Sequence, residues 1–150
     1  MLIIFTDGAC FGNPGPMGIG VVIYRDDVRI EELSEYIGNG TNNMAEYTAV
    51  VKALETVHSL GETEAHIKSD SQLIVKQLNN EYKVKDPELR ILRDRIQRLC
   101  KGLKVKFEHV PREKNSEADL LSKEAAELGR RRENENKQKA LPRQIYDVRA

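Results

Sequence analysis

The 150-residue sequence predicts a single α/β domain built on one mixed β-sheet. Two observations support this fold class. The length suits one hydrophobic core and is short for two. The apolar patterns follow the order three strands, a helix, a strand, two helices, a strand and a helix. Because a two-residue turn at Asp26 and Asp27 joins the second strand to the third, we expect the first three strands to form an antiparallel meander.

The N-terminal strands are predicted from apolar runs and turn residues. Residues 2–5 form a continuous apolar run, so we expect a buried central strand that ends at Asp7. Residues 8–18 contain four glycines and two prolines, which predicts a loop whose backbone amides can approach a ligand closely. Two further strands are predicted at residues 20–25 and 28–37.

The middle of the chain is predicted to be helix, strand and helix. Residues 42–60 repeat apolar side chains at helical spacing, and Gly61 is a typical stop. Residues 65–68 read as a short strand that leads to Asp70. A short helix is then expected over residues 72–79.

The C-terminal part begins with Asp86 and Pro87, a typical N-cap followed by proline at the first helical position. This helix should end at Gly102, and residues 103–110 alternate like a strand. Residues 111–114 read as a loop. The last helix is predicted over residues 116–128, with three side chains facing inward: Leu121, Ala125 and Leu128.

Charge and composition limit the class of protein. The chain carries 24 Lys and Arg against 24 Asp and Glu, so bulk charge alone would not hold it on nucleic acid. Residues 1–60 have three basic against eight acidic residues, which can concentrate divalent cations. Two cysteines fit neither a disulfide framework nor a zinc site. With no signal peptide or membrane-spanning run in the sequence, we expect a cytoplasmic protein and no membrane partner.

The C-terminal end differs from the rest in composition. Residues 130–150 carry seven basic against three acidic residues, and residues 130–139 are polar enough to be disordered. We therefore divide the chain into a domain at residues 1–128 and a basic polar tail at residues 129–150. The tail either touches phosphates or is simply a solvated segment.

Four carboxylates are candidates for chemistry: Asp7, Glu46, Asp70 and Asp119. Each has a structural alternative. The Asp7-Gly8 pair is also typical of a turn, and Asp70 is also a candidate N-cap. Glu46 and Asp119 each complete a capping-box pattern, with Asn43 and Ser116 respectively.

The position of these acids favours a shared site. Glu46 lies on the apolar stripe of its helix, where a charge is costly without a partner. Asp7 and Asp70 both end apolar strands, and the carboxyl ends of parallel neighbours meet at one edge of a sheet. The side chain of Asp119 could point either toward the core or away from it. Carboxylates without a His or Cys cluster suit Mg²⁺ or Mn²⁺, and two such ions roughly 3.5–4 Å apart can hydrolyse a phosphodiester.

Four motifs with compatible spacing resemble the type 1 ribonuclease H family. They are TDGACFGNPGPMG, TNNMAEYTAVVKALE, SDSQLIVKQL and NSEADLLSKEAA, and the resemblance covers residues 1–128. It implies a five-stranded mixed sheet with helices on both faces. It also implies an endonuclease that cuts the RNA strand of RNA–DNA hybrids with divalent metal, leaving 5′-phosphate and 3′-hydroxyl ends.

The resemblance assigns roles residue by residue. Asp7, Glu46, Asp70 and Asp119 match the acids that hold two Mg²⁺ or Mn²⁺ ions. Matches to the substrate-binding residues are Gly12, Asn13, Asn42 and Asn43 for the minor groove, Thr41 for a DNA phosphate, and Gln72 for the hybrid. Because the 2′-hydroxyl lies in the shallow minor groove, such contacts distinguish RNA without reading its sequence.

The sequence departs from the family in two places. Residues 111–114 lack the histidine that well-studied bacterial members carry in this loop, and Arg112 is our candidate substitute at the scissile phosphate. An arginine cannot act as a base near neutral pH. His109 is better explained as a strand residue. Only residues 81–85 remain where many members have a basic protrusion, so the chain resembles compact variants, some of which also tolerate double-stranded RNA.

The sequence leaves two other functions open. One is a non-catalytic module that binds hybrid or double-stranded RNA, against which the four intact acids argue. The other is a DNA-directed nuclease of the same fold, against which the asparagine-rich groove contacts argue. Whichever of these functions the protein has, we expect it to be a monomer.

Overall fold

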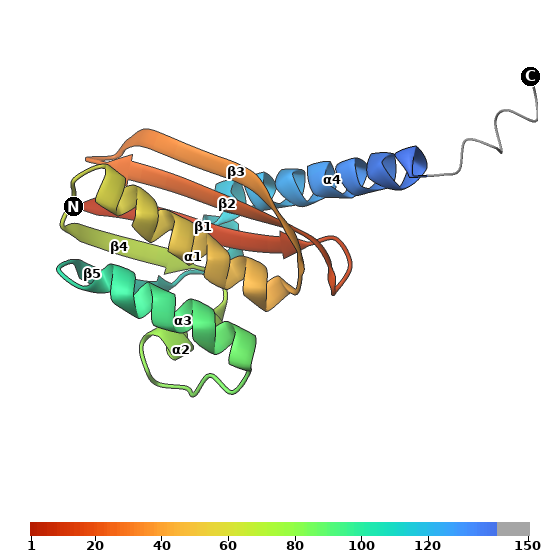
Figure 1. Ribbon diagram of the computed structural model, residues 1–150. Coiled ribbons are helices and arrows are strands. Elements are labelled where there is room, and N and C mark those ends of the chain that lie inside the picture. Colours follow the sequence, from red (N-terminus) through yellow and green to blue (C-terminus); the bar gives the residue numbers. More distant parts are fainter. Residues whose placement is uncertain (141–150) are drawn as a thin grey trace, which may run out of the picture.

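The computed structural model describes residues 1–140, which form a five-stranded mixed sheet with helices on both faces (Figure 1). The predicted fold class is therefore confirmed. The strands are β1 (Leu2–Cys10), β2 (Gly15–Arg25), β3 (Val28–Gly40), β4 (Glu64–Ser69) and β5 (Lys104–His109). The helices are α1 (Asn42–Ser59), α2 (Gln72–Leu78), α3 (Pro87–Cys100) and α4 (Ser116–Lys139), with a short 3₁₀ turn at Arg112–Lys114.

The sheet has the order β3-β2-β1-β4-β5, which places β1 at its centre. β1, β2 and β3 pair antiparallel, as the predicted meander requires, whereas β4 is parallel to both β1 and β5. The parallel pairing of β1 with β4 ends at Thr6 and Ser69. Asp7 follows Thr6 in β1, and Asp70 follows Ser69 at the end of β4. The two aspartates therefore come directly after paired residues, at the point where the two strands separate.

β1 is longer than the sequence predicts. It does not end at Asp7 but runs to Cys10, because residues 8–10 continue the antiparallel pairing with β2. The glycine-rich segment is therefore mostly strand, and only residues 11–14 form the connecting loop. The strand prediction failed here because glycine and proline argue against strand by composition, while the pairing with β2 satisfies the backbone.

One face of the sheet is covered by α1, and α3 packs beside α1 (Figure 1). The apolar stripe of α1 is buried as predicted, with Ala49, Leu54 and Val57 fully inaccessible. The stripe meets Leu2 and Ile4 of β1 in the main hydrophobic cluster. The core therefore lies between the sheet and α1.

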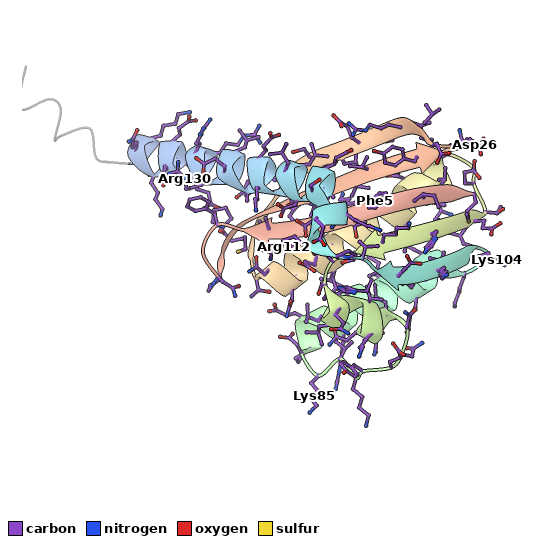
Figure 2. The ribbon with its side chains drawn as sticks, turned by 180° about the vertical axis from the view of Figure 1, so that it is seen from behind. Phe5, Asp26, Lys85, Lys104, Arg112 and Arg130 are labelled. Carbon is purple, nitrogen blue, oxygen red and sulfur yellow. The ribbon has the colours of Figure 1, made fainter. Side chains whose placement is uncertain are left out.

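The opposite face is covered by α4, which lies against β1, β2 and β3 (Figure 2). Two glycines of β2 make the approach close. A Cβ atom on Gly18 would lie 2.2 Å from the Ser122 carbonyl oxygen, and one on Gly20 would lie 2.1 Å from the Ala118 carbonyl oxygen. Side chains at these positions would push the helix away from the strand.

α4 continues well past the predicted end at residue 128. The expectation of disorder over residues 130–139 was wrong, since the helix runs to Lys139. Leu128, predicted to face inward, is 41% exposed, and Gly129 is buried against Tyr36 instead. The expected boundary between domain and tail falls inside this helix. The rest of the expected tail, residues 141–150, lies outside the described residues.

Within residues 1–140, no helix combines the length and the apolar character needed to cross a membrane.

We predict that Gly8→Ala will destabilise the protein strongly, by about 3 kcal/mol, because its Cβ would lie 2.3 Å from the Glu46 backbone nitrogen. Gly38→Ala is the control, since nothing lies within 4 Å of its added methyl group and only its φ of +91° is unfavourable. That change should cost about 1 kcal/mol. Urea unfolding measures both values, and equal losses would contradict the close packing of α1 on β1.

Candidate active site

Three of the four candidate carboxylates converge at the point where β1 and β4 separate. Asp7 comes from β1, Glu46 from α1, and Asp70 from the connection between β4 and α2. One oxygen of each side chain lies within 4.8 Å of one oxygen of the other two. Residues distant in the chain thus form one compact acidic group, which we call the carboxylate cluster.

Asp7 lies inside the sheet and is only 6% exposed. Its backbone pairs with Gly20, and that glycine allows α4 to approach. Through this approach the Ser122 hydroxyl reaches Asp7 and donates a hydrogen bond of 2.9 Å to its Oδ2 atom. The interpretation of Asp7-Gly8 as a turn is excluded, because both residues are paired in β1.

Glu46 is brought to the cluster by the close contact of α1 with Gly8. The N-cap of α1 is Thr41, whose hydroxyl accepts the Met44 amide at 3.2 Å. The alternative capping box with Asn43 is therefore excluded. The Glu46 Oε2 atom is buried and has no hydrogen-bond partner within the described residues.

Asp70 is not an N-cap either. Ser71 caps α2, and its hydroxyl accepts the Ile74 amide at 3.3 Å. The Asp70 carboxylate is half-buried and belongs to the carboxylate cluster. Its charge contributes to the rise in the pKa of Asp7 and of Glu46.

Asp119 lies beside the cluster and outside the group of three. It is in the first turn of α4, where no side-chain cap is formed, so the capping box with Ser116 is not present. Its carboxylate forms an ion pair of 2.9 Å with Lys123. It nevertheless lies close enough to Asp7 to contribute to the rise in the pKa of Asp7.

The cluster is electrostatically strained without a cation. Burial, followed by the charges of Asp70 and Glu46, raises the pKa of Asp7 to about 8. Burial and the charge of Asp70 raise the pKa of Glu46 to about 7. A proton or a metal ion would relieve this repulsion.

The donor set fits a divalent cation. It consists of hard carboxylate oxygens with no histidine or cysteine among them, which suits Mg²⁺ or Mn²⁺ better than zinc. The unpartnered Glu46 Oε2 atom is a buried acceptor that a cation would satisfy. The cluster is therefore suited to divalent metal binding.

Sequence reasoning missed two residues that support the cluster. Ser122 hydrogen-bonds to Asp7, and the buried Asn115 donates from its Nδ2 atom to the Thr6 carbonyl oxygen at 2.9 Å. Asn115 thereby fixes the start of α4 against β1. The spacing of Ser122 three residues after Asp119 placed it one helical turn away, but nothing in the pattern indicated its partner.

The predicted groove-binding residues come together at one end of the sheet. The backbone amide of Asn42, at the start of α1, donates to the Asn13 Oδ1 atom at 3.2 Å. This bond joins the loop at residues 11–14 to the beginning of α1. Four residues of this group are exposed, two from the loop and two from the start of α1. We call these four residues the amide loop pair: Gly12, Asn13, Asn42 and Asn43.

The remaining candidates lie around the cluster. Gln72 is exposed at the first turn of α2, two residues after Asp70. Arg112 is exposed in the 3₁₀ turn just before α4 (Figure 2), and it forms no ion pair within residues 1–140. His109 is the last residue of β5 and pairs with Ser69, in agreement with its interpretation as a strand residue.

Comparisons with known proteins give the family. A family model described as reverse transcriptase-like matches residues 5–125. Ribonuclease HI of Halobacterium salinarum is 41% identical over 123 residues, covering 81% of this chain and 62% of that protein. The crystal structure of LC11-RNase H1 in complex with an RNA/DNA hybrid is 42% identical, covers 85% of this chain and 98% of that chain, and has a TM-score of 0.81.

A bifunctional protein of Mycobacterium tuberculosis is 39% identical over 127 residues, which cover 83% of this chain. The chain spans only 35% of that protein and less than two thirds of the Halobacterium relative. The fold and the carboxylate cluster define an α/β domain with an acidic site, compatible with divalent metal, where β1 and β4 separate. Together with the matches, they show that the chain belongs to the ribonuclease H family.

The raised pKa values predict a pH-dependent stability for the metal-free protein. Because the pKa of Asp7 is higher in the folded state, folded protein binds more protons than unfolded protein between about pH 4 and about pH 8. Its contribution to stability is complete below about pH 4 and is lost as the pH rises through about 8. Asp7→Asn should therefore flatten this decline and stabilise the protein at about pH 8.5 by about 2 kcal/mol.

Urea unfolding in the presence of a chelator, at several pH values, measures this effect. Asp27→Asn is the control, because Asp27 is an exposed turn residue with a positive φ that asparagine also tolerates. It should leave the pH profile unchanged. If Asp7→Asn unfolds at the same denaturant concentrations as the original protein at every pH, the pKa of Asp7 is not raised by burial and neighbouring charges as described.

Proposed function

We propose that this protein is an endoribonuclease that hydrolyses the RNA strand of RNA–DNA hybrids and leaves 5′-phosphate and 3′-hydroxyl ends. The observation that carries the proposal is the convergence of Asp7, Glu46 and Asp70 within 4.8 Å on a ribonuclease H fold. A relative of 42% identity has been crystallised with an RNA/DNA hybrid. This supports the hybrid as the substrate of the present chain.

The proposed cofactor is a pair of Mg²⁺ or Mn²⁺ ions, both present when substrate is bound. Bound divalent ions supply a nucleophilic water at neutral pH and stabilise the charge on the leaving oxygen. Asp7, Glu46 and Asp70 would hold them. Asp119 would join from the start of α4 after exchanging its ion pair with Lys123, which costs little because the lysine is exposed.

The chain's own contribution is to hold these acids in fixed positions around one point. Asp7 is on the central strand, and the Ser122 hydrogen bond favours its charged form. Glu46 and Asp70 are carried by a helix and by the end of a strand, both anchored in the core. A rigid site of this kind is already arranged before substrate arrives, so little reorganisation is needed during the reaction.

Substrate recognition is proposed for the amide loop pair. Its short amides and exposed backbone groups can donate to and accept from 2′-hydroxyl groups in the minor groove. Thr41 would contact a DNA phosphate, and Gln72 would contact the hybrid beside the cluster. Since base edges are not read, cleavage should depend little on sequence and could extend to double-stranded RNA.

Arg112 is proposed to contact the scissile phosphate. It is exposed and free of ion pairs within the described residues, and it lies in the turn that leads into α4 and Asp119. Its guanidinium would add positive charge there without taking up a proton. We further propose that the protein acts as a monomer in the cytoplasm.

We predict that the purified protein will cut a labelled RNA–DNA hybrid in Mg²⁺ or Mn²⁺, and will leave a DNA duplex intact. Asp7→Asn should lower the cleavage rate by at least about 100-fold, because an amide is a poor ligand for two cations. An RNA duplex in the same panel measures the tolerance for RNA in both strands. Product ends are identified by their sensitivity to phosphatase.

Two outcomes would contradict the proposal. Binding of the hybrid without cleavage in either metal would indicate a non-catalytic binding module. Cleavage of the DNA duplex in preference to the hybrid would indicate a DNA-directed nuclease. Asp27→Asn again serves as the matched control, and it should cut the hybrid at the original rate.

A further inference from the structure

The C-terminal part of α4 is a charged arm that projects beyond the sheet (Figure 1). Residues 130–139 carry five basic side chains against two acidic ones, and the helix passes the loop at residues 11–14 in both views (Figures 1 and 2). The basic residues are Arg130, Arg131, Arg132, Lys137 and Lys139. None of them belongs to the carboxylate cluster.

The arm is fixed to the body of the protein. The Glu133 carboxylate accepts hydrogen bonds from the Tyr36 hydroxyl at 2.7 Å and from the Asn39 side-chain amide at 2.5 Å. One turn earlier, Gly129 packs directly against the Tyr36 ring. These contacts determine which side of the helix faces the sheet. They thereby also fix the directions in which the basic side chains of the arm leave the helix.

One flank of the arm faces the loop that carries Gly12 and Asn13. The Arg130 guanidinium lies over the Phe11 ring, 5.1 Å from its centroid. A groove of about 530 Å³ separates the loop from the helix, and its walls include Phe11, Pro14 and Lys137. The ammonium group of Lys137 forms no ion pair within residues 1–140, whereas Arg130 is paired with Glu127.

The opposite flank carries a comparable charge. With about 100° of rotation per helical residue, Lys139 lies about 160° around the helix from Lys137. Arg132 lies close to Lys139 in this projection, and neither lines the groove. The helix therefore places a lysine on each flank, at nearly the same distance along its axis, and of these two only Lys137 lines the groove beside the loop.

We propose that the loop-facing flank of α4 contacts the phosphate backbone of the hybrid, with Lys137 as the principal contact. This inference rests on the proposed function, because it takes the Gly12 and Asn13 loop as a minor-groove contact. A duplex held there that continues past the loop would bring its backbone charges to Lys137, which lines the groove and forms no ion pair within the described residues. The Glu133 carboxylate also lines this groove and keeps its negative charge, but hydrogen bonds from Tyr36 and Asn39 hold it toward β3.

The test compares Lys137→Glu with Lys139→Glu in the full-length protein. Both residues are exposed, and both substitutions change the charge equally. Lys137→Glu should raise the KM for a long hybrid about 5-fold with kcat unchanged, and should reduce the slope of log KM against log salt concentration by about one. Lys139→Glu should change KM less than about 2-fold, since it faces away.

A second measurement separates this inference from the proposed function. Binding of a fluorescein-labelled hybrid to the Asp7→Asn protein, with and without Lys137→Glu, is followed by anisotropy and does not require cleavage. A selective loss with Lys137→Glu supports the contact even if the protein does not cut the hybrid. Equal effects of the two lysine variants, or none from either, would overturn it. A hybrid shorter than one helical turn should bind both variants alike, because it cannot reach the arm.

Discussion

The burial of carboxylates that the fold holds close together, with the repulsion between them, is the constraint on which the site depends. Asp7, Glu46 and Asp70 are brought within 4.8 Å of one another in a partly buried setting, and the pKa values of Asp7 and Glu46 rise accordingly. Such an arrangement costs stability unless a proton or a cation compensates it. The packing of the rest of the domain has to supply that stability, and in return the site is ready to bind divalent metal.

The packing does so through close contacts between helices and the two central strands. α1 lies on the backbone of Gly8, and α4 lies on the backbone of Gly18 and Gly20 from the other side of the sheet. The first contact carries Glu46 to Asp7, and the second carries Ser122 and Asp119 to the same residue. Glycines in these strands therefore serve the site as well as the fold, because any side chain there would separate the acids from one another.

The sequence predicted the order of the elements, the apolar stripe of α1 and the meeting of Asp7 with Asp70, because these follow from periodicity and from strand direction. It failed where tertiary contacts override composition. β1 continues through Gly8 because β2 pairs with it, and α4 continues past Leu128 because Gly129 and Glu133 bind Tyr36. The placement of Asp119 outside the group of three, and its pairing with Lys123, depend on side-chain conformations that no sequence pattern indicates.

The central claim is that the carboxylate cluster is a site for divalent cations, and anomalous X-ray diffraction from crystals of the intact protein soaked in Mn²⁺ tests it directly. The account predicts an anomalous peak in contact with Asp7 and with Glu46 or Asp70. A well-ordered cluster with no peak at saturating Mn²⁺, or peaks only at other acidic positions on the surface, would contradict it.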